Sequence, residues 1–156
     1  ITLEAEDVPV PFRGRGEQGK GYSGFTLRYA PRRQPSASVV TPEGRLAADA
    51  VQKPFPWADY SAQFGEDDAF SGMAIFDSPR NPTHPTTWLT RYYGVLNPTW
   101  PALEWFTLEK GKPVTLRYRL WIHLGNAEEG KVANAWAVYS QPPAVEVVNA
   151  VARPTR

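Results

Sequence analysis

The stretch Ser71–Pro98, SGMAIFDSPRNPTHPTTWLTRYYGVLNP, joins a short apolar run to a proline-rich segment. The run MAIF is typical of a buried strand, and Asp77 ends it. Pro79, Pro82 and Pro85 then recur at every third residue, and each of them fixes φ and removes a backbone donor. Because this pattern excludes both a helix and a central strand, we predict a stiff, ordered loop over residues 77–91. Polar and aromatic groups on rigid loops form many binding sites.

The clearest strand of the chain is Val114–Leu124, VTLRYRLWIHL. Its even-numbered residues are all apolar or aromatic, whereas its odd-numbered residues include two Arg, a Trp and a His. Since successive side chains of a strand point to opposite faces, we predict that the even-numbered face packs into the core. The predicted core residues are Leu116, Tyr118, Leu120 and Ile122, with Arg117, Arg119 and His123 on the opposite face.

Other alternating runs predict strands at residues 1–7, 25–29, 38–40, 57–64 and 105–108, and residues 144–148 resemble one more. Residues 46–53 fit either a strand or a helical turn. Ala127–Tyr139 is the one good helix candidate, because its apolar residues repeat at helical spacing. We therefore predict an all-β fold, a mostly antiparallel β-sandwich of about eight or nine strands with one helix near the C-terminus.

Length, net charge and amino-acid composition exclude several classes of protein. The 156 residues suffice for one domain and no compositional shift divides them, so we predict a single domain over residues 1–156. Seventeen Lys and Arg against sixteen Asp and Glu give a net charge of +1, which favours neither nucleic acid nor a membrane surface as a partner. The absence of Cys excludes disulfides and Cys-ligated metals. No apolar run approaches the roughly 20 residues of a membrane helix.

His84 and His123 are the candidate catalytic residues, together with Asp77, whose carboxylate could orient an imidazole. Each histidine also has an ordinary interpretation, as a surface imidazole or as a hydrogen-bonded edge residue. Neither HxH nor HExxH spacing occurs, and the glycine-rich segment 16–21 lacks the Ser or Thr and the helix of a phosphate loop. We therefore predict no metal site and no cofactor.

Arginines and tryptophans supply the candidate binding groups. Arginines in or beside strands would either pair with Asp59 and Asp77 in a structural network or form a carboxylate-binding cluster that suits an acidic sugar. Trp88 and Trp100 could stack on a sugar ring, whose apolar face matches an indole. The candidate substrate-binding residues are Arg80, Asn81, Trp88, Arg91, Tyr93, Asn97, Arg117 and Arg119.

The spacing IFDxPxNPxxPxxWxxRxYG, which begins at Ile75, and the later LRYR run with His123 resemble the PmoA-like family, often labelled "methane oxygenase PmoA". The resemblance spans most of residues 1–139 and corresponds to the C-terminal half of larger members. The label carries no weight for function, because a methane monooxygenase subunit is an integral membrane protein and this chain has no such span. Two family features are absent: a His-rich motif of the type DHPHHRG, and an acidic residue after His123, where Leu124 stands.

The resemblance implies a fold similar to the galactose-mutarotase-like supersandwich, a carbohydrate ligand and export to the periplasm or the outside of the cell. The chain begins at Ile1 rather than Met, as would follow from a removed signal peptide, trimming or a cut between domains. It could therefore be the C-terminal half of a larger two-part domain, with an N-terminal half or a second subunit as a partner.

Three functions stay open at this point. The first is a carbohydrate-active enzyme that uses His84 or His123 as acid or base. The second is a non-catalytic carbohydrate-binding or accessory sandwich with the same loop. The third is a structural half-domain whose active site lies in a missing N-terminal part. We expect saccharide binding or processing, and the sequence leaves enzymatic turnover undecided.

Overall fold

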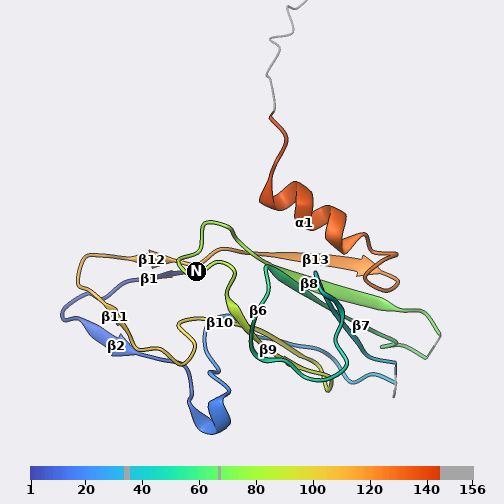
Figure 1. Cartoon of the computed structure of the whole chain (residues 1–156), viewed down its shortest axis with the longest axis horizontal. Coiled ribbons are helices and arrows are strands. Elements are labelled where there is room, and N and C mark those ends of the chain that lie inside the picture. The colour runs from blue at the N-terminus through green and yellow to red at the C-terminus, as the bar shows by residue number, and fades with distance from the viewer. Residues whose placement is uncertain (34–35, 67, 145–156) are drawn as a thin grey trace, which may run out of the picture.

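The computed structural model describes residues 1–33, 36–66 and 68–144, and it confirms the predicted all-β sandwich with a helix near the C-terminus. Two sheets pack face to face, and the helix α1 (Val132–Ser140) lies on the outer face of the larger one (Figure 1). Every strand pair within the described residues is antiparallel. The layers are therefore helix, five-stranded sheet and four-stranded sheet.

The strand order is simple in both main sheets. The larger sheet contains, in spatial order, β13 (Tyr118–Leu124), β8 (Ser71–Asp77), β7 (Trp57–Ala62), β4 (Ser38–Thr41) and β5 (Gly44–Arg45). The smaller sheet contains β3 (Leu27–Arg28), β10 (Val95–Thr99), β9 (Thr87–Arg91) and β6 (Val51–Pro54). Two short pairs flank them: β1 (Thr2–Leu3) with β12 (Val114–Thr115), and β2 (Val10–Phe12) with β11 (Phe106–Leu108). A 3-10 turn, η1 (Glu17–Gly19), lies in the glycine-rich segment.

The strand β7 lies between β8 and β4 and is buried on both faces. All six of its residues are buried, because Ala58 and Tyr60 face the smaller sheet while Trp57 lies under α1. Its Asp59 and Ser61 are therefore buried polar groups rather than the solvated side of an amphipathic strand. Burying a polar side chain is costly without a hydrogen bond; Asp59 Oδ1 has a partner in His123, whereas Asp59 Oδ2 and Ser61 Oγ have none among the described residues.

The predicted elements are found with shorter bounds. The segment 1–7 contains only β1, the segment 25–29 only β3, and residues 46–53 become the strand β6. The helix begins at Val132 instead of Ala127, because Lys131 adopts a left-handed φ of 51° that a continuous α-helix cannot include. Residues 145–148, where one more strand was expected, lie outside the described residues. No helix in the described part of the chain is long and apolar enough to span a membrane.

The predicted burial of β13 is wrong for half of its apolar face. The alternation itself is correct, and Leu116 is buried, but Leu120, Ile122 and Leu124 are 42%, 77% and 83% exposed. The cause is the reach of the smaller sheet: Phe25 stacks on Tyr118 and the Tyr29 hydroxyl donates to the Met73 carbonyl, and no described residue buries the β13 face beyond them. On the opposite face His123 is buried instead, under residues 125–131.

Paired substitutions in β8 and β13 test this correction. Ile75 and Leu120 are direct neighbours in the register, yet Ile75 is fully buried and Leu120 is not. We expect Ile75→Ala to lower the free energy of unfolding by about 2–5 kcal/mol and Leu120→Ala by less than about 1 kcal/mol, since only the former leaves a cavity. Urea unfolding followed by circular dichroism measures both. Equal losses would contradict the exposed position of Leu120.

Candidate functional site

The loop between β8 and β9 is built around one carboxylate. Asp77 ends β8 with no exposed surface, and its Oδ2 accepts hydrogen bonds from His84 Nδ1 at 2.9 Å and from the Thr86 backbone N–H at 3.0 Å. Its Oδ1 accepts from Asn81 Nδ2 at 2.7 Å. Three donors from within nine residues of Asp77 thus fold the segment 78–86 over it. A buried carboxylate with this many donors holds its loop in one conformation.

Asn81 joins the same loop to β13. Its Oδ1 accepts from the Arg117 backbone N–H at 2.7 Å, and its Nδ2 donates to the Arg117 carbonyl at 2.8 Å. The amide side chain therefore replaces a missing strand neighbour just before β13 begins. Because both backbone groups of Arg117 are fixed in this way, the Arg117 side chain projects from a defined point beside the loop.

His84 has the geometry of an oriented imidazole. Its ring stacks on Trp136 of α1, with centroids 5.9 Å apart and planes at 24°. Its Nδ1 faces Asp77, its side chain is 21% exposed, and no described residue makes a hydrogen bond to Nε2. A carboxylate that fixes one ring nitrogen leaves the other available for proton transfer or for a ligand. The expected role of Asp77 as the group that orients a histidine matches this contact.

We expect neutral His84 to carry its proton on Nδ1, because the Asp77 carboxylate accepts there. Long-range ¹H–¹⁵N correlation spectra distinguish the two tautomers, and a His84→Gln variant assigns the signals. The second histidine is a built-in comparison, since His123 faces a carboxylate through Nε2 instead. A neutral His84 protonated only on Nε2 would contradict the contact with Asp77.

His123 forms a second, closed pair. Its Nε2 lies 2.8 Å from Asp59 Oδ1, and both side chains are almost completely buried. The ring lies between Gly72 and Gly130, and a Cβ at Gly72 would come within 2.8 Å of it. Both glycines therefore make room for the imidazole. His123 cannot reach a ligand in this position, so its candidacy as a catalytic residue is withdrawn.

The Asp59 pair shifts the protonation of His123. Burial alone would lower the pKa of His123, but the hydrogen bond and the charge of Asp59 together with the carbonyls of Leu124 and Gly125 raise this pKa above its ordinary value of 6.5. The folded protein therefore binds this proton more tightly than the unfolded chain does. The stabilisation is complete below pH 6.5 and is lost as the pH rises through the raised pKa.

The pH dependence of stability tests this second pair. We expect the difference in melting temperature between the wild type and His123→Gln to be largest near about pH 5.5 and to shrink toward about pH 9. The difference between the two proteins cancels the contributions of groups that behave alike in both. Thermal melts in buffers of constant ionic strength provide the measurement. A difference that grows with pH would have the wrong sign for a raised pKa.

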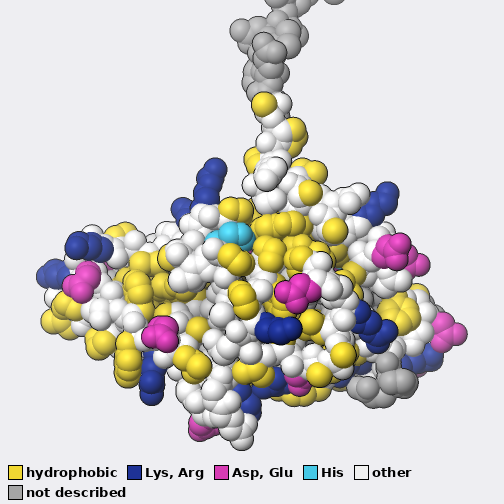
Figure 2. All heavy atoms as spheres, viewed as in Figure 1, with side chains coloured by type: hydrophobic (Ala, Val, Ile, Leu, Met, Phe, Trp, Pro, Cys, Tyr) yellow, Lys and Arg dark blue, Asp and Glu magenta, His cyan; other side chains and the backbone are white. Residues whose placement is uncertain are grey.

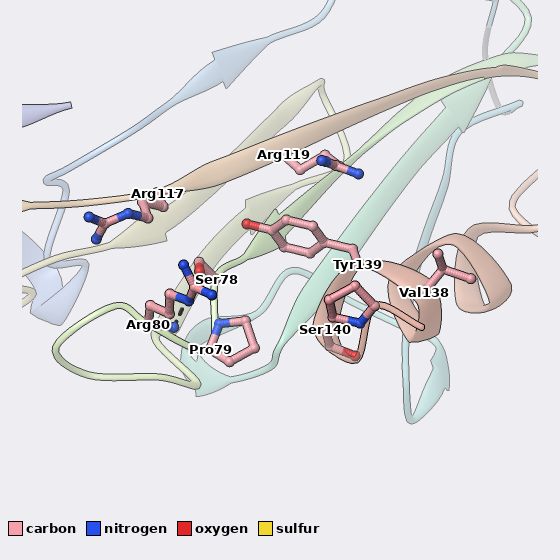
Figure 3. A pocket seen from close by; sticks show the side chains of 9 residues that line it. Ser78, Pro79, Arg80, Arg117, Arg119, Val138, Tyr139 and Ser140 are labelled. Carbon is pink, nitrogen blue, oxygen red and sulfur yellow. Dashed lines mark hydrogen bonds between the residues drawn. The ribbon is translucent and has the colours of Figure 1, made fainter. Parts of the chain in front are cut away.

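A groove lies between the 78–86 loop, the start of β13 and the end of α1 (Figure 3). It has a volume of about 420 Å³, and its main side chains are Arg80, Arg117, Arg119 and Tyr139. The Arg119 guanidinium lies 4.7 Å from the centre of the Tyr139 ring, whereas the Arg117 side chain points away from that ring. Within the described residues, none of the three arginines forms an ion pair with a carboxylate. The groove is therefore cationic and unneutralised.

The expected pairing of arginines with Asp59 and Asp77 is wrong, because both carboxylates bind histidines. Arg91 instead lies 3.5 Å from Asp49. Both aspartates are completely buried, so an arginine partner would have to bury its charged guanidinium as well, which costs desolvation free energy. A histidine is smaller and can be neutral.

Four other candidate binding residues lie in the smaller sheet or at its turn, away from the groove. Trp88 is fully buried and donates from Nε1 to the Phe55 carbonyl, so it offers no ring face to a sugar; the same burial excludes Trp100. Asn97 is also buried and donates to the carbonyls of Ser23 and Phe25. Arg91 is almost buried beside Asp49, and Tyr93 is exposed at the turn between β9 and β10. The reason is that the loop ends at Thr86, so residues 87–99 form a hairpin of the sandwich.

The sequence interpretation missed two aromatic residues of the site. Trp136 stacks on His84 and Tyr139 lines the groove, and both lie on α1. Their spacing in the sequence indicated only the inner face of a helix. Both rings also contact Phe76, so packing of the helix on the sheet accounted for them without a site.

Comparison with known proteins gives a family and no function. A family model described as "Family of unknown function (DUF6807)" matches residues 1–137. The chain belongs to the DUF6807 family. No curated protein and no solved structure matches it. For this DUF6807 member, the resemblance to the PmoA-like family and the analogy to galactose mutarotase therefore stay predictions.

Proposed function

We propose that this DUF6807 member binds an acidic saccharide in the groove between the 78–86 loop, β13 and α1. The observation that carries the proposal is that Arg80, Arg117 and Arg119 all line one groove and have no carboxylate partner in the described residues. Guanidinium groups bind carboxylates and sulfates through paired hydrogen bonds, and a groove lined by several of them favours an anion.

The remaining lining fits a sugar rather than a small inorganic ion. Tyr139, Val138 and Pro142 give the groove an apolar wall, and Ser78 and Ser140 bring hydroxyl groups to its margin. A pyranose ring presents both an apolar face and several hydroxyls, so mixed walls of this kind suit it. A volume of about 420 Å³ is large enough for one or two sugar rings.

The His84–Asp77 pair supports a catalytic version of the same proposal. The loop that carries Arg80 into the groove also carries His84. On α1, Trp136 stacks on His84, and Tyr139, which contacts Trp136, lines the groove. His84 does not itself line the groove, so it would act as a general acid or base only on a sugar that extends from the groove toward the imidazole. Binding without turnover would place the chain in the non-catalytic, accessory class.

Saccharide titrations of the wild type and matched arginine variants test the proposal. We expect uronic-acid oligosaccharides to bind more tightly than neutral oligosaccharides of the same length, and the affinity to fall with salt. Arg119→Ala should weaken binding by about tenfold or more, since a charge-assisted hydrogen bond contributes roughly 1.5–3 kcal/mol. Arg45→Ala, on the far edge strand β5, is the matched control and should bind like the wild type. Calorimetry measures all six combinations of protein and saccharide.

Two results would reject the groove as a saccharide site. One is a wild type that binds neither acidic nor neutral saccharides. The other is acidic saccharide binding that Arg119→Ala and Arg80→Ala leave unchanged. Where binding is found, His84→Gln separates the two classes of function: an enzyme loses turnover with its affinity retained, whereas an accessory protein shows no turnover in either form.

A further inference from the structure

A second cleft, with a volume of about 340 Å³, lies beside the 78–86 loop and shares no lining residue with the cationic groove. The loop contributes Thr83 and Pro85 to this cleft, whereas its Arg80 lines the groove. The other walls come from β6, from the paired ends of β9 and β10, and from residues 101–104. The same loop thus contributes to two hollows in the surface.

The polar side chains that line this cleft include no Lys or Arg. They belong to Gln52, Thr83, Thr86, Thr87, Thr99 and Glu104. Thr83 and Glu104 are exposed, and their side chains form no hydrogen bond or ion pair with another described residue. Pro85, Pro101 and Leu103 add apolar surface. Hydroxyls, an amide and a carboxylate around a small apolar surface suit an uncharged sugar better than an anion.

Gln52 reaches the cleft because β6 is irregular at this residue. The pairing of β6 with β9 shifts register between Val51 and Lys53, and Gln52 has a left-handed φ of 55°. A β-bulge redirects a side chain, whereas left-handed backbone is unfavourable for a residue with a Cβ. Gly21 makes room for the amide, since a Cβ at Gly21 would lie 2.5 Å from Gln52 Nε2. Backbone strain that places a polar side chain in a cleft is typical of a binding site.

The turn that carries Glu104 is strained in the same way. Ala102 has a left-handed φ of 62°. The Gly14 N–H donates to the Ala102 carbonyl at 2.6 Å, and the Ala102 N–H donates to Ser23 Oγ at 3.2 Å. These contacts fix the turn from outside the cleft. The two residues that follow, Leu103 and Glu104, then line the cleft.

The hydrogen-bond network around Gln52 lacks one proton. Gln52 Nε2 donates to the Lys20 carbonyl at 2.9 Å, so Oε1 is the atom that faces Thr87 Oγ1 at 3.1 Å. Thr87 Oγ1 also lies 2.6 Å from Thr99 Oγ1, and Thr99 Oγ1 lies 2.9 Å from the Thr87 carbonyl. Two hydroxyl protons serve these three contacts, so one acceptor receives none. A ligand hydroxyl that donates to Gln52 Oε1 completes the network.

We propose that this cleft binds a neutral sugar residue. Sugar hydroxyls donate to Gln52 Oε1 and to the Glu104 carboxylate and accept from the Thr83 hydroxyl. The carboxylate disfavours an anionic ligand, because no Lys or Arg stands beside it among the lining residues. Figure 2 shows basic and acidic side chains interspersed over one face of the molecule, so no field of a single sign attracts a charged ligand there. Since the two hollows share no lining residue, this site is independent of acidic saccharide binding in the groove.

Titration of ¹⁵N-labelled protein with neutral oligosaccharides of glucose, galactose, mannose or xylose tests the proposal. We expect at least one of these saccharides to shift the amide signals of Thr83, Thr87 and Glu104 and to leave those of Arg119 and Tyr139 in place. The dissociation constant should be the same at low and at high salt, because the ligand is uncharged. A wild type that binds none of these saccharides overturns the proposal. Shifts at Arg119 and Tyr139 alone would assign neutral saccharides to the groove and also overturn it.

Three variants test the polar groups of the cleft. Thr87→Val and Thr83→Val each remove one hydroxyl, and Gln52→Asn shortens the amide while asparagine still tolerates the left-handed φ. Each should raise the dissociation constant by about threefold to tenfold, as the loss of one neutral hydrogen bond predicts. Thr83 is exposed and makes no hydrogen bond among the described residues, so its variant keeps the fold.

Thr107→Val is the matched control, because Thr107 is an exposed residue of β11 that does not line the cleft. It should bind neutral saccharides like the wild type. Thermal melts confirm that each variant is folded. Folded variants at Gln52, Thr83 and Thr87 that all bind like the wild type would assign the saccharide to a different surface and overturn the proposal.

Discussion

The buried carboxylate of Asp77 is the constraint on which the site depends. A carboxylate without solvent must receive hydrogen bonds, and three groups of the following loop supply them. The same three donors decide where the loop lies: Asn81 continues to the backbone of Arg117, and His84 continues to Trp136 of the helix. One side chain thereby connects the 78–86 loop to β13 and α1, and these three segments line the groove.

Asp59 is a second buried carboxylate that binds a histidine, but its histidine is enclosed. Both aspartates lie on inner strands of the larger sheet, and both bind a histidine, but His123 is enclosed between glycines, whereas Asp77 ends its strand and its partner His84 lies on the following loop. The closed pair stabilises the sheet under residues 125–131. The open pair leaves one imidazole nitrogen available. Position along the strand, rather than residue type, separates a structural pair from a candidate functional one.

Local pattern explains which features were predictable. Alternation located β7 and β13, a short apolar run located β8, and the proline spacing indicated the ordered loop, because all three patterns depend on neighbouring residues alone. The exposure of Leu120 and Ile122 was not predictable, since it depends on how far the smaller sheet extends across β13. The partners of Asp59 and Asp77 were also misjudged, because residues 64 positions apart in the one case and 7 in the other meet only in the folded sheet.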